Sequence, residues 1–436
     1  MKIKITLLLA TILFLQNAFA QDRKITLQEA IDLGVKNSKQ LKADAAKIIA
    51  ATAGVTQAED NRLPGFTVSG SYLRLATPTI STKIKALSGS DSSKSPKINQ
   101  AMYGIASVSY PLFTGGKIKF GIESARFLEQ ATRLDVDNDK QGVILNTVDA
   151  FINLYKSEKV ITLIKESLET SRKRDTDFLR LENNGLLARN DRLKASLQTS
   201  NIELSLLDAE SNRKVSNINL NLMLGLAEGT ILSPDSASLK SATNIKTIDE
   251  YEQMALHRKD IEALSYRQKA ASSSVKVAIA EKYPTIALTG GYVAASIPNF
   301  ITITNAVNIG IGVQYNVAGL WKTNTNLQKA RAREQELLAN SEQLNDAVRM
   351  EVNRDFENYL LSTKKIDVYD KAVQQAEENY RITKNKYDNS LVTTTDLLDA
   401  DVAQLQARLN VTLAKADAIA AYNKLLQTTG TLNTQQ

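Results

Sequence analysis

The sequence repeats itself at a spacing of 205 residues, although the two copies share few identical side chains. Shifting the first half by this distance brings a series of residues onto their counterparts without a change of register. The matched pairs include Val108 with Val313, Tyr110 with Tyr315, Lys117 with Lys322, Phe151 with Phe356 and Gly225 with Gly430. A repeat of this length is one large structural unit used twice. The sequence therefore predicts two structural repeats, over residues 21–230 and 231–436.

The N-terminus has the three parts of a secretory signal peptide. Lys2 and Lys4 precede an apolar run over residues 5–15, and an Ala-x-Ala cleavage site follows at residues 18–20. A retained membrane anchor is the alternative, but this run is too short to cross a bilayer. We expect residues 1–20 to be removed, which predicts an exported protein of a Gram-negative cell. The absence of cysteine excludes disulfides and an acyl-cysteine lipid anchor.

Composition excludes several classes of function. The formal net charge of +7 falls to +5 without Lys2 and Lys4, and it is spread along the chain, so no nucleic-acid partner is predicted. The single histidine, His257, has no second histidine or cysteine with which to bind a metal. No Ser/His/Asp or Cys/His set can be assembled. The sequence therefore predicts a protein that is not an enzyme and that uses no metal and no cofactor.

Two proline-free stretches, residues 116–182 and 321–388, predict long helices. Each would be roughly 100 Å long as a single helix, so it needs packing partners along its whole length. The second stretch carries a coiled-coil seam with alternating steps of three and four residues. The seam is Ile366, Tyr369, Val373, Ala376, Tyr380, Thr383 and Tyr387. Shorter helices are predicted over about 26–61, 190–224, 248–282 and 394–429.

Four strands are predicted between the helices, two in each repeat, over about 64–75, 101–114, 284–295 and 304–318. In the last of them, large apolar residues alternate with polar residues or glycine from Val307 to Val317. This pattern is typical of a strand with lipid on one side and water or a lumen on the other. The extra residues of the first repeat fit a solvated Ser/Lys-rich loop over 76–99. No run of the mature chain reaches 18 apolar residues, so no transmembrane helix is predicted. A membrane role would therefore require these strands.

A soluble β-sandwich is the alternative for the strands, but four strands joined to two long helices offer no second sheet. In a membrane, four strands cannot close a barrel, because open edges would leave backbone groups unpaired in lipid. The smallest barrels have about eight strands. Copies of the chain must therefore pool 8, 12 or 16 strands, and geometry alone leaves this choice open.

Four motifs, in this order, resemble the outer-membrane efflux protein family, the TolC-like channels. They are Tyr110-Pro-Leu-Phe-Thr-Gly-Gly-Lys117, Asn184-Gly185-Leu186 before Asp191, Tyr387-Asp-Asn-Ser-Leu391 before Asp396, and Ala421-Tyr422-Asn423-x-Leu425 before Gly430. The resemblance covers nearly the whole mature chain. It implies a mainly α fold with a small β part. In this fold, a long coiled-coil α-helical barrel is continuous with a trimeric, 12-strand transmembrane β-barrel, to which each chain gives four strands.

The resemblance also implies a function and partners. The protein would be the outer-membrane exit duct of a tripartite efflux or type I secretion system, with a periplasmic extension. Its partners would be two further copies of itself, a periplasmic adaptor (membrane fusion) protein, an inner-membrane transporter and outer-membrane lipid. The cargo stays open among drugs, metal ions, siderophores and proteins.

Asp396 and Asp399 match the gate aspartates of the family. They stand at i and i+3, on one helical face. In a trimer they would form two rings of three carboxylates, which select cations and repel one another. The alternative is an ordinary helix start, with Thr393 as N-cap and Asp396 favoured by the helix dipole. Both can hold for the same aspartate.

Asp191 and Tyr387 match family positions that bridge neighbouring helices and latch the gate. Val392 stands where related channels carry an arginine of this latch, which predicts a weaker or differently wired latch. Phe113 and Trp321 flank the strand-to-helix junctions, as membrane-interface aromatics do, with a plain core role as the alternative.

A protein of another class shares some of these features. A structural periplasmic coiled coil or surface adhesin without a lumen would also have long helices and an export signal. It would not explain paired amphipathic strands at matched places in both repeats. The channel is therefore the hypothesis that accounts for more of the sequence.

Overall fold

The computed structural model describes residues 23–76, 98–239, 245–298, 300–317 and 324–432. The chain divides into two units that cut across the sequence repeats, because each unit takes segments from both halves. The sheet unit is Lys47–Arg133 with Ala263–Ser341. The helical unit is Met1–Ala46, Leu134–Glu262 and Glu342–Gln436. The expected signal peptide, most of the loop at 76–99 and Trp321 lie outside the described residues.

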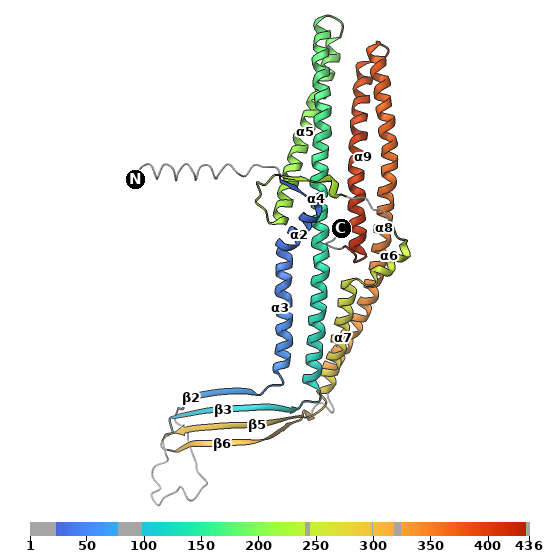
Figure 1. Ribbon diagram of the computed structural model, residues 1–436. Helices are drawn as coiled ribbons and strands as arrows, with labels where there is room; N and C mark the ends of the chain where they lie inside the picture. The colour runs from blue at the N-terminus through green and yellow to red at the C-terminus, as the bar shows by residue number, and fades with distance from the viewer. Residues whose placement is uncertain (1–22, 77–97, 240–244, 299, 318–323, 433–436) are drawn as a thin grey trace, which may run out of the picture. The chain divides into compact units, whose positions relative to one another are not determined.

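The sheet unit is built on four antiparallel strands in the order β2-β3-β5-β6 (Figure 1). The strands are β2 (Gly65–Arg74), β3 (Gln100–Phe113), β5 (Thr285–Ile297) and β6 (Ile301–Gln314). Each sequence repeat contributes one antiparallel pair, and β3 joins β5 at the centre. Within the described residues of one chain, the outer edges of β2 and β6 are unpaired.

The strand register collects the apolar side chains on one face of the sheet. Residues directly opposite each other in antiparallel strands point to the same side, and Phe66, Val108, Gly290 and Ile309 form such a row. The next row on this face is Val68, Ala106, Tyr292 and Val307. We call it the apolar face. The rows between them, such as Thr67, Ser107, Gly291 and Asn308, form the polar face.

The apolar face is open to the surroundings rather than packed into a core. Ile309 is 81% exposed and Val307 is 77% exposed. Phe66 and Val68 on the other edge strand are also largely exposed. A soluble protein seldom presents a continuous apolar surface of this kind without a partner.

Two glycines make the turn from β3 into the long helix α4 (Lys117–Asn183). Gly115 and Gly116 have φ angles of 62° and 89°, a region that residues with a Cβ rarely adopt. A Cβ on Gly115 would also lie 2.8 Å from the Tyr283 Cβ and 2.9 Å from the Ala280 carbonyl oxygen. The Gly-Gly pair of the first motif is therefore required by both backbone conformation and space.

The helices of the sheet unit pack closely through small residues. Helix α7 (Lys259–Ala280) lies against α4, where Ser124 Oγ donates to the Ala270 carbonyl oxygen at 3.0 Å. The Phe127 and Tyr266 rings meet across the same pair of helices, with centroids 6.2 Å apart. The second long helix, α8 (Thr325–Asp388), corresponds to the predicted stretch 321–388.

Two predicted helices are each interrupted in the structure. The stretch 26–61 is α2 (Leu27–Asn37) and α3 (Lys39–Asp60), because Ser38 leaves the helical conformation and its Oγ accepts from the Leu41 N–H. The stretch 248–282 is α6 (Ile248–Ala255) and α7. In both places the chain turns at a capped helix end instead of continuing one rod.

The helical unit consists of two helical hairpins and a small connecting layer. Helix α4 turns into α5 (Arg189–Leu224), and α8 turns into α9 (Thr394–Thr428) (Figure 1). Strand β1 (Arg23–Ile25) pairs in parallel with β4 (Leu232–Pro234), next to a short 3-10 helix, η2 (Ser236–Ser238). The main core packs α2, α4, α5 and this strand pair together around Phe151, Val148, Leu220, Leu224 and Ile25.

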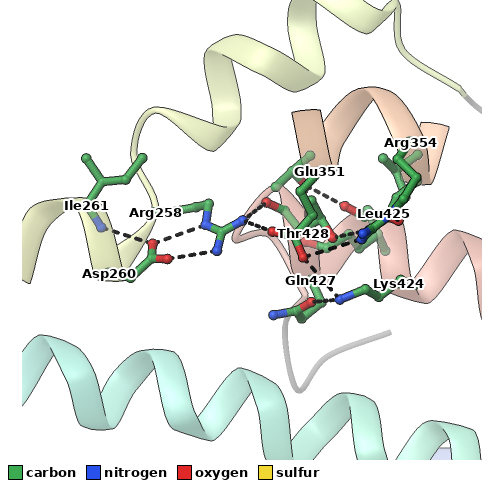
Figure 2. Close-up of polar contacts among 12 residues, drawn as sticks. Arg258, Asp260, Ile261, Glu351, Arg354, Lys424, Leu425, Gln427 and Thr428 are labelled. Atoms are coloured by element: carbon green, nitrogen blue, oxygen red, sulfur yellow. Dashed lines mark hydrogen bonds and ion pairs between the residues drawn. The ribbon is translucent and has the colours of Figure 1, made fainter. Parts of the chain in front are cut away.

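Arg258 fastens the α6–α7 corner to the α8–α9 hairpin (Figure 2). Its guanidinium donates to the Asp260 carboxylate at 2.7 and 3.1 Å, to Glu351 at 2.8 Å and to the Thr428 carbonyl oxygen at 3.0 Å. Lys424 adds an ion pair to Glu351 at 3.5 Å. Burial lowers the pKa of Arg258, but its hydrogen bonds with Asp260 and Glu351 outweigh this and hold the pKa above its ordinary value. The corner is therefore fixed by a paired charge network.

The described residues confirm the predicted fold class of long helices with a small sheet. None of the helices in this part of the chain combines the length and the apolar content needed to cross a bilayer.

Candidate functional site

The tips of the two hairpins share one turn geometry at repeat-related positions. At the end of α4, Leu186 N–H donates to the Leu181 carbonyl oxygen at 2.9 Å, around Gly185 with φ 71°. At the end of α8, Leu391 N–H donates to the Lys386 carbonyl oxygen at 2.8 Å, around Ser390 with φ 57°. This is the Schellman helix ending. It leaves Leu186 and Leu391 as matched tip leucines, each 74% exposed.

Asp396 stands in the first turn of α9 and closes a capping box. Its carboxylate accepts from the Thr393 N–H at 2.8 Å and from the Thr393 hydroxyl at 2.7 Å, and its own N–H donates to Thr393 Oγ1 at 3.2 Å. The hydrogen bonds from the Thr393 hydroxyl and amide lower the pKa of Asp396 below its ordinary value. The carboxylate is exposed, so it caps the helix and remains ionised at the surface.

Asp399 lies on the same helical face and is also exposed. Among the described residues its carboxylate forms no hydrogen bond and no ion pair. The two predicted gate aspartates thus differ: Asp396 is held by Thr393, and Asp399 is held by nothing in the described chain. The pair places two negative charges at the tip of the α8–α9 hairpin.

The predicted latch residues lie at the tips but have separate partners. The Tyr387 hydroxyl is 3.3 Å from Thr394 Oγ1, and its ring stacks on Phe178 with centroids 5.7 Å apart. Asp191 forms an ion pair with Lys194 at 3.2 Å. No hydrogen bond joins Asp191 to Tyr387 within the described residues. The structure therefore places both residues at the tips without joining them to each other.

Lys194 makes the polar contact between the starts of α5 and α9. Its ammonium donates to Thr395 Oγ1 at 3.2 Å while it pairs with Asp191. A small apolar cluster lies beside it, with Phe178, Ala195, Leu397 and Leu398 buried between the two hairpins. The hairpin tips are therefore in direct contact within one chain.

Sequence reasoning missed a buried ion pair near the tips. Arg174 of α4 and Asp401 of α9 approach to 2.9 Å, and their side chains are only 9% and 10% exposed. Arg174 Nη2 also lies 3.5 Å from the Tyr380 hydroxyl of α8. Tyr380 belongs to the predicted seam, but nothing in the sequence pairs Arg174 with a residue so far along the chain. We call these three residues the clasp.

Phe113 is the last residue of β3 and pairs with Ile286 across the sheet. It lies on the apolar face, because Ile286 is opposite Val313 of β6. Its side chain is 46% exposed in the single chain.

The comparisons with known proteins agree with this architecture. The family model described as outer membrane efflux protein matches residues 30–226 and 251–431. The chain therefore belongs to the outer membrane efflux protein family, which is a family of channels, and its compartment is the outer membrane. No match is found among curated protein sequences.

Solved outer-membrane channels have the same fold. The outer-membrane channel OprN is 19% identical, with a TM-score of 0.77, and the match covers 94% of this chain and 91% of that one. CusC is 18% identical, with a TM-score of 0.78 and coverage of 93% and 92%. VceC from Vibrio cholerae is 19% identical, with a TM-score of 0.75 and coverage of 93% and 96%. At these identities the likeness shows the fold, and the chain spans nearly the full length of each channel.

Proposed function

We propose that three copies of this chain form the passive exit duct of a tripartite efflux or type I secretion system. The observation that carries the proposal is the sheet, which has one apolar face, one polar face and two open edges. Four strands with open edges cannot stand alone in lipid, because the unpaired backbone groups would have no partner. Pairing β6 of one copy with β2 of the next satisfies both edges. Three copies give 12 strands, the number that the family resemblance implies.

The sheet faces then have distinct roles. The apolar face contacts lipid, and the polar face, rich in serine, threonine, asparagine and glycine, lines the lumen. Small polar residues leave room for cargo and hydrogen-bond water along the path. The duct needs no chemistry of its own, since an inner-membrane transporter supplies the energy.

The hairpin tips form the gate of this duct in our proposal. Three copies of Asp396 and Asp399 would gather up to six carboxylates around one axis, which favours cations and disfavours close approach of the copies. The clasp, the Lys194–Thr395 contact and the buried tip cluster oppose this repulsion within each chain. The gate would rest closed when these contacts outweigh the repulsion.

The tip leucines Leu186 and Leu391 give the periplasmic adaptor a place to bind. Both are 74% exposed on matched turns, so a trimer would present six of them. Exposed apolar side chains gathered on one surface mark sites of protein–protein interaction. Contacts at these turns would also reach the nearby clasp, which links adaptor binding to gate opening.

One experiment tests the duct directly. The protein purified in detergent should run as a trimer by mass, and its reconstitution into liposomes should release a trapped ion or conduct current. A pure trimer that never conducts would defeat the proposal. A stable monomer that needs no detergent would favour the rival class, a periplasmic coiled coil or adhesin without a lumen.

A further inference from the structure

Lysines of the sheet unit converge on aromatic rings close to the sheet. Lys119 of α4 and Lys276 of α7 lie over one ring, that of Phe120, with their ammonium groups 5.8 and 5.3 Å from its centroid. Both lysines are exposed, and neither forms an ion pair within the described residues. Lys117, by contrast, is 4.0 Å from Glu281. Two ammonium groups without an ion pair, from two helices, therefore lie close to the same aromatic ring.

Such a pair is electrostatically unfavourable without an anion. The two positive charges repel each other, and the attraction of an exposed cation to an aromatic ring is weak. Glu123, one turn after Lys119 on α4, forms no ion pair with either lysine in the described chain. An anion that contacted both ammonium groups would remove the repulsion and gain two charge-assisted hydrogen bonds.

The position of the lysine pair relative to the sheet indicates which class of anion would bind there. The end of the sheet nearest the helices carries an aromatic band of Tyr110, Phe113 and Tyr315, each 41–46% exposed. Tyr110 and Phe113 lie on the apolar face, and Tyr315 directly follows β6. Membrane proteins show this order of apolar surface, aromatic residues and then basic residues where a bilayer ends.

The distances fit the headgroup layer. The polar layer on each side of a bilayer is roughly 5–7 Å thick. Lys276 is four residues from the end of α7, about 6 Å along the helix, and Lys119 is two residues from the start of α4, about 3 Å. Lysine side chains extend toward such a layer while their stems cover apolar surface. With the sheet in the bilayer, as in the proposed function, the pair would lie at the depth of lipid phosphates.

We propose that Lys119 and Lys276, over the ring of Phe120, bind the phosphate of an anionic phospholipid in the periplasmic leaflet of the outer membrane. This inference rests on the proposed function in one respect, that the apolar face contacts lipid. It adds a site of defined chemistry: two ammonium donors beside one aromatic ring, at the end of the sheet nearest the helices. Each trimer would hold three such lipids and would be fixed in depth by them.

The chain offers a matched control. Lys269 also lies over an aromatic ring, 4.5 Å from the Tyr266 centroid, on the same helix α7. It is seven residues further from the sheet than Lys276, which is about 10 Å along the helix and beyond the headgroup layer. Lys269→Gln thus removes one lysine charge and the same kind of ring contact outside the proposed site.

The test measures lipid retained by the intact trimer. Dioctanoyl phosphatidylglycerol is titrated into detergent-purified wild type, the double variant Lys119→Gln with Lys276→Gln, and Lys269→Gln, and native mass spectrometry counts bound lipid. We expect roughly thirty-fold weaker lipid binding in the double variant and unchanged binding in Lys269→Gln. The arginine pair Lys119→Arg with Lys276→Arg should retain binding, which separates lost charge from lost folding.

Other outcomes would overturn the site. Equal loss in Lys269→Gln, or no loss in the double variant, removes the special role of the pair. Full competition by inorganic phosphate at millimolar concentration assigns the pair to free phosphate instead of lipid. A changed ion selectivity of the double variant in liposomes, with lipid binding unchanged, places the lysines in the lumen. Wild-type conductance, measured in the same preparation, reports separately on the duct, so failure of the lipid site is distinguishable from failure of the channel.

Discussion

Arg174 and Asp401 join the two helical hairpins by an ion pair of 2.9 Å in which both side chains are nine-tenths buried. Two residues away on the same helix, Arg172 pairs with Glu203 at 2.8 Å, but these side chains are 62% and 44% exposed. The two pairs have nearly equal length and opposite surroundings. Of these two pairs only the buried one spans both hairpins, so it can hold the tips together alongside the Lys194–Thr395 contact and the buried tip cluster.

Replacing Arg174 should therefore loosen the tips. Arg174→Gln leaves the Asp401 carboxylate buried without its cation, which costs about 3–5 kcal/mol. We expect lower resistance to chemical denaturation and a higher resting conductance in planar bilayers. Arg172→Gln is the control, because an exposed pair contributes about 0–1 kcal/mol. Equal effects of the two substitutions would mean that the clasp has no special part in holding the tips.

The two predicted gate aspartates, Asp396 and Asp399, should differ in their effects when substituted. Asp399→Asn is expected to lower cation selectivity and leave thermal stability unchanged, since Asp399 has no partner in the described chain. Asp396→Asn should lower both cation selectivity and thermal stability, because the Asp396 carboxylate accepts hydrogen bonds from Thr393. Asp396→Ala with Asp399→Ala should raise conductance and antibiotic leak. Thr393→Ala removes the capping partner without removing a charge, and it should leave selectivity intact. Unchanged conductance in the double alanine variant would argue against a carboxylate ring.

Asp149 predicts a pH dependence of stability. Burial raises the pKa of Asp149, although Lys156 and Lys424 act in the opposite direction. A carboxyl whose folded pKa lies above its unfolded value is more stabilising when protonated, so its contribution falls as pH rises through the unfolded and then the folded pKa. Above both pKa values the cost of the buried charge is fully present. Asp149→Asn should raise the melting temperature at pH 7 and have little effect near pH 3. A lower melting temperature at pH 7 would show that the two lysines outweigh burial.

A close approach between α2 and α4 depends on Gly34. A Cβ at this position would lie 2.6 Å from Thr147 Oγ1, and Thr147 is fully buried with its hydroxyl bonded to the Val143 carbonyl oxygen. Because this side chain cannot move aside, Gly34→Ala should destabilise the helical unit by about 1–3 kcal/mol. Gly142→Ala, in α4 with nothing within 4 Å, should instead stabilise by about 0.5–1 kcal/mol. Denaturant titration of both variants measures the change in the free energy of unfolding. Changes of the same sign in the two variants would contradict the packing argument.

The sequence was sufficient for features that repeat or alternate. The period of two in β6, the long proline-free stretches and the 205-residue repeat each follow from many residues, so the strands and long helices could be predicted. Features that depend on one residue or on one tertiary contact could not be predicted in this way. Ser38 interrupts one predicted helix by capping the next, although a serine is also common inside helices. The clasp depends on how two hairpins dock, and no periodic signal reports the partner of Arg174.

The orientation of the sheet gives the most direct prediction for the membrane. Ile309 and Asn308 are neighbours in β6, but Ile309 lies on the apolar face with Gly290 and Val108, and Asn308 lies on the polar face with Gly291. A lysine on a lipid-facing position near the membrane centre costs about 2–4 kcal/mol, whereas a lumen position tolerates charge. Ile309→Lys should therefore reduce insertion into outer membranes and trimer yield. Asn308→Lys should insert normally and shift ion selectivity toward anions.

Ile309→Lys and Asn308→Lys are a matched pair, because they introduce the same charge at neighbouring positions and differ only in the face of the sheet. Outer-membrane fractionation measures insertion, and single-channel recording measures selectivity. If Asn308→Lys blocked insertion while Ile309→Lys changed selectivity, the sheet would face the opposite way. If both variants inserted and conducted like wild type, neither face of β6 would meet lipid or cargo, and the strand could not belong to the wall of a duct.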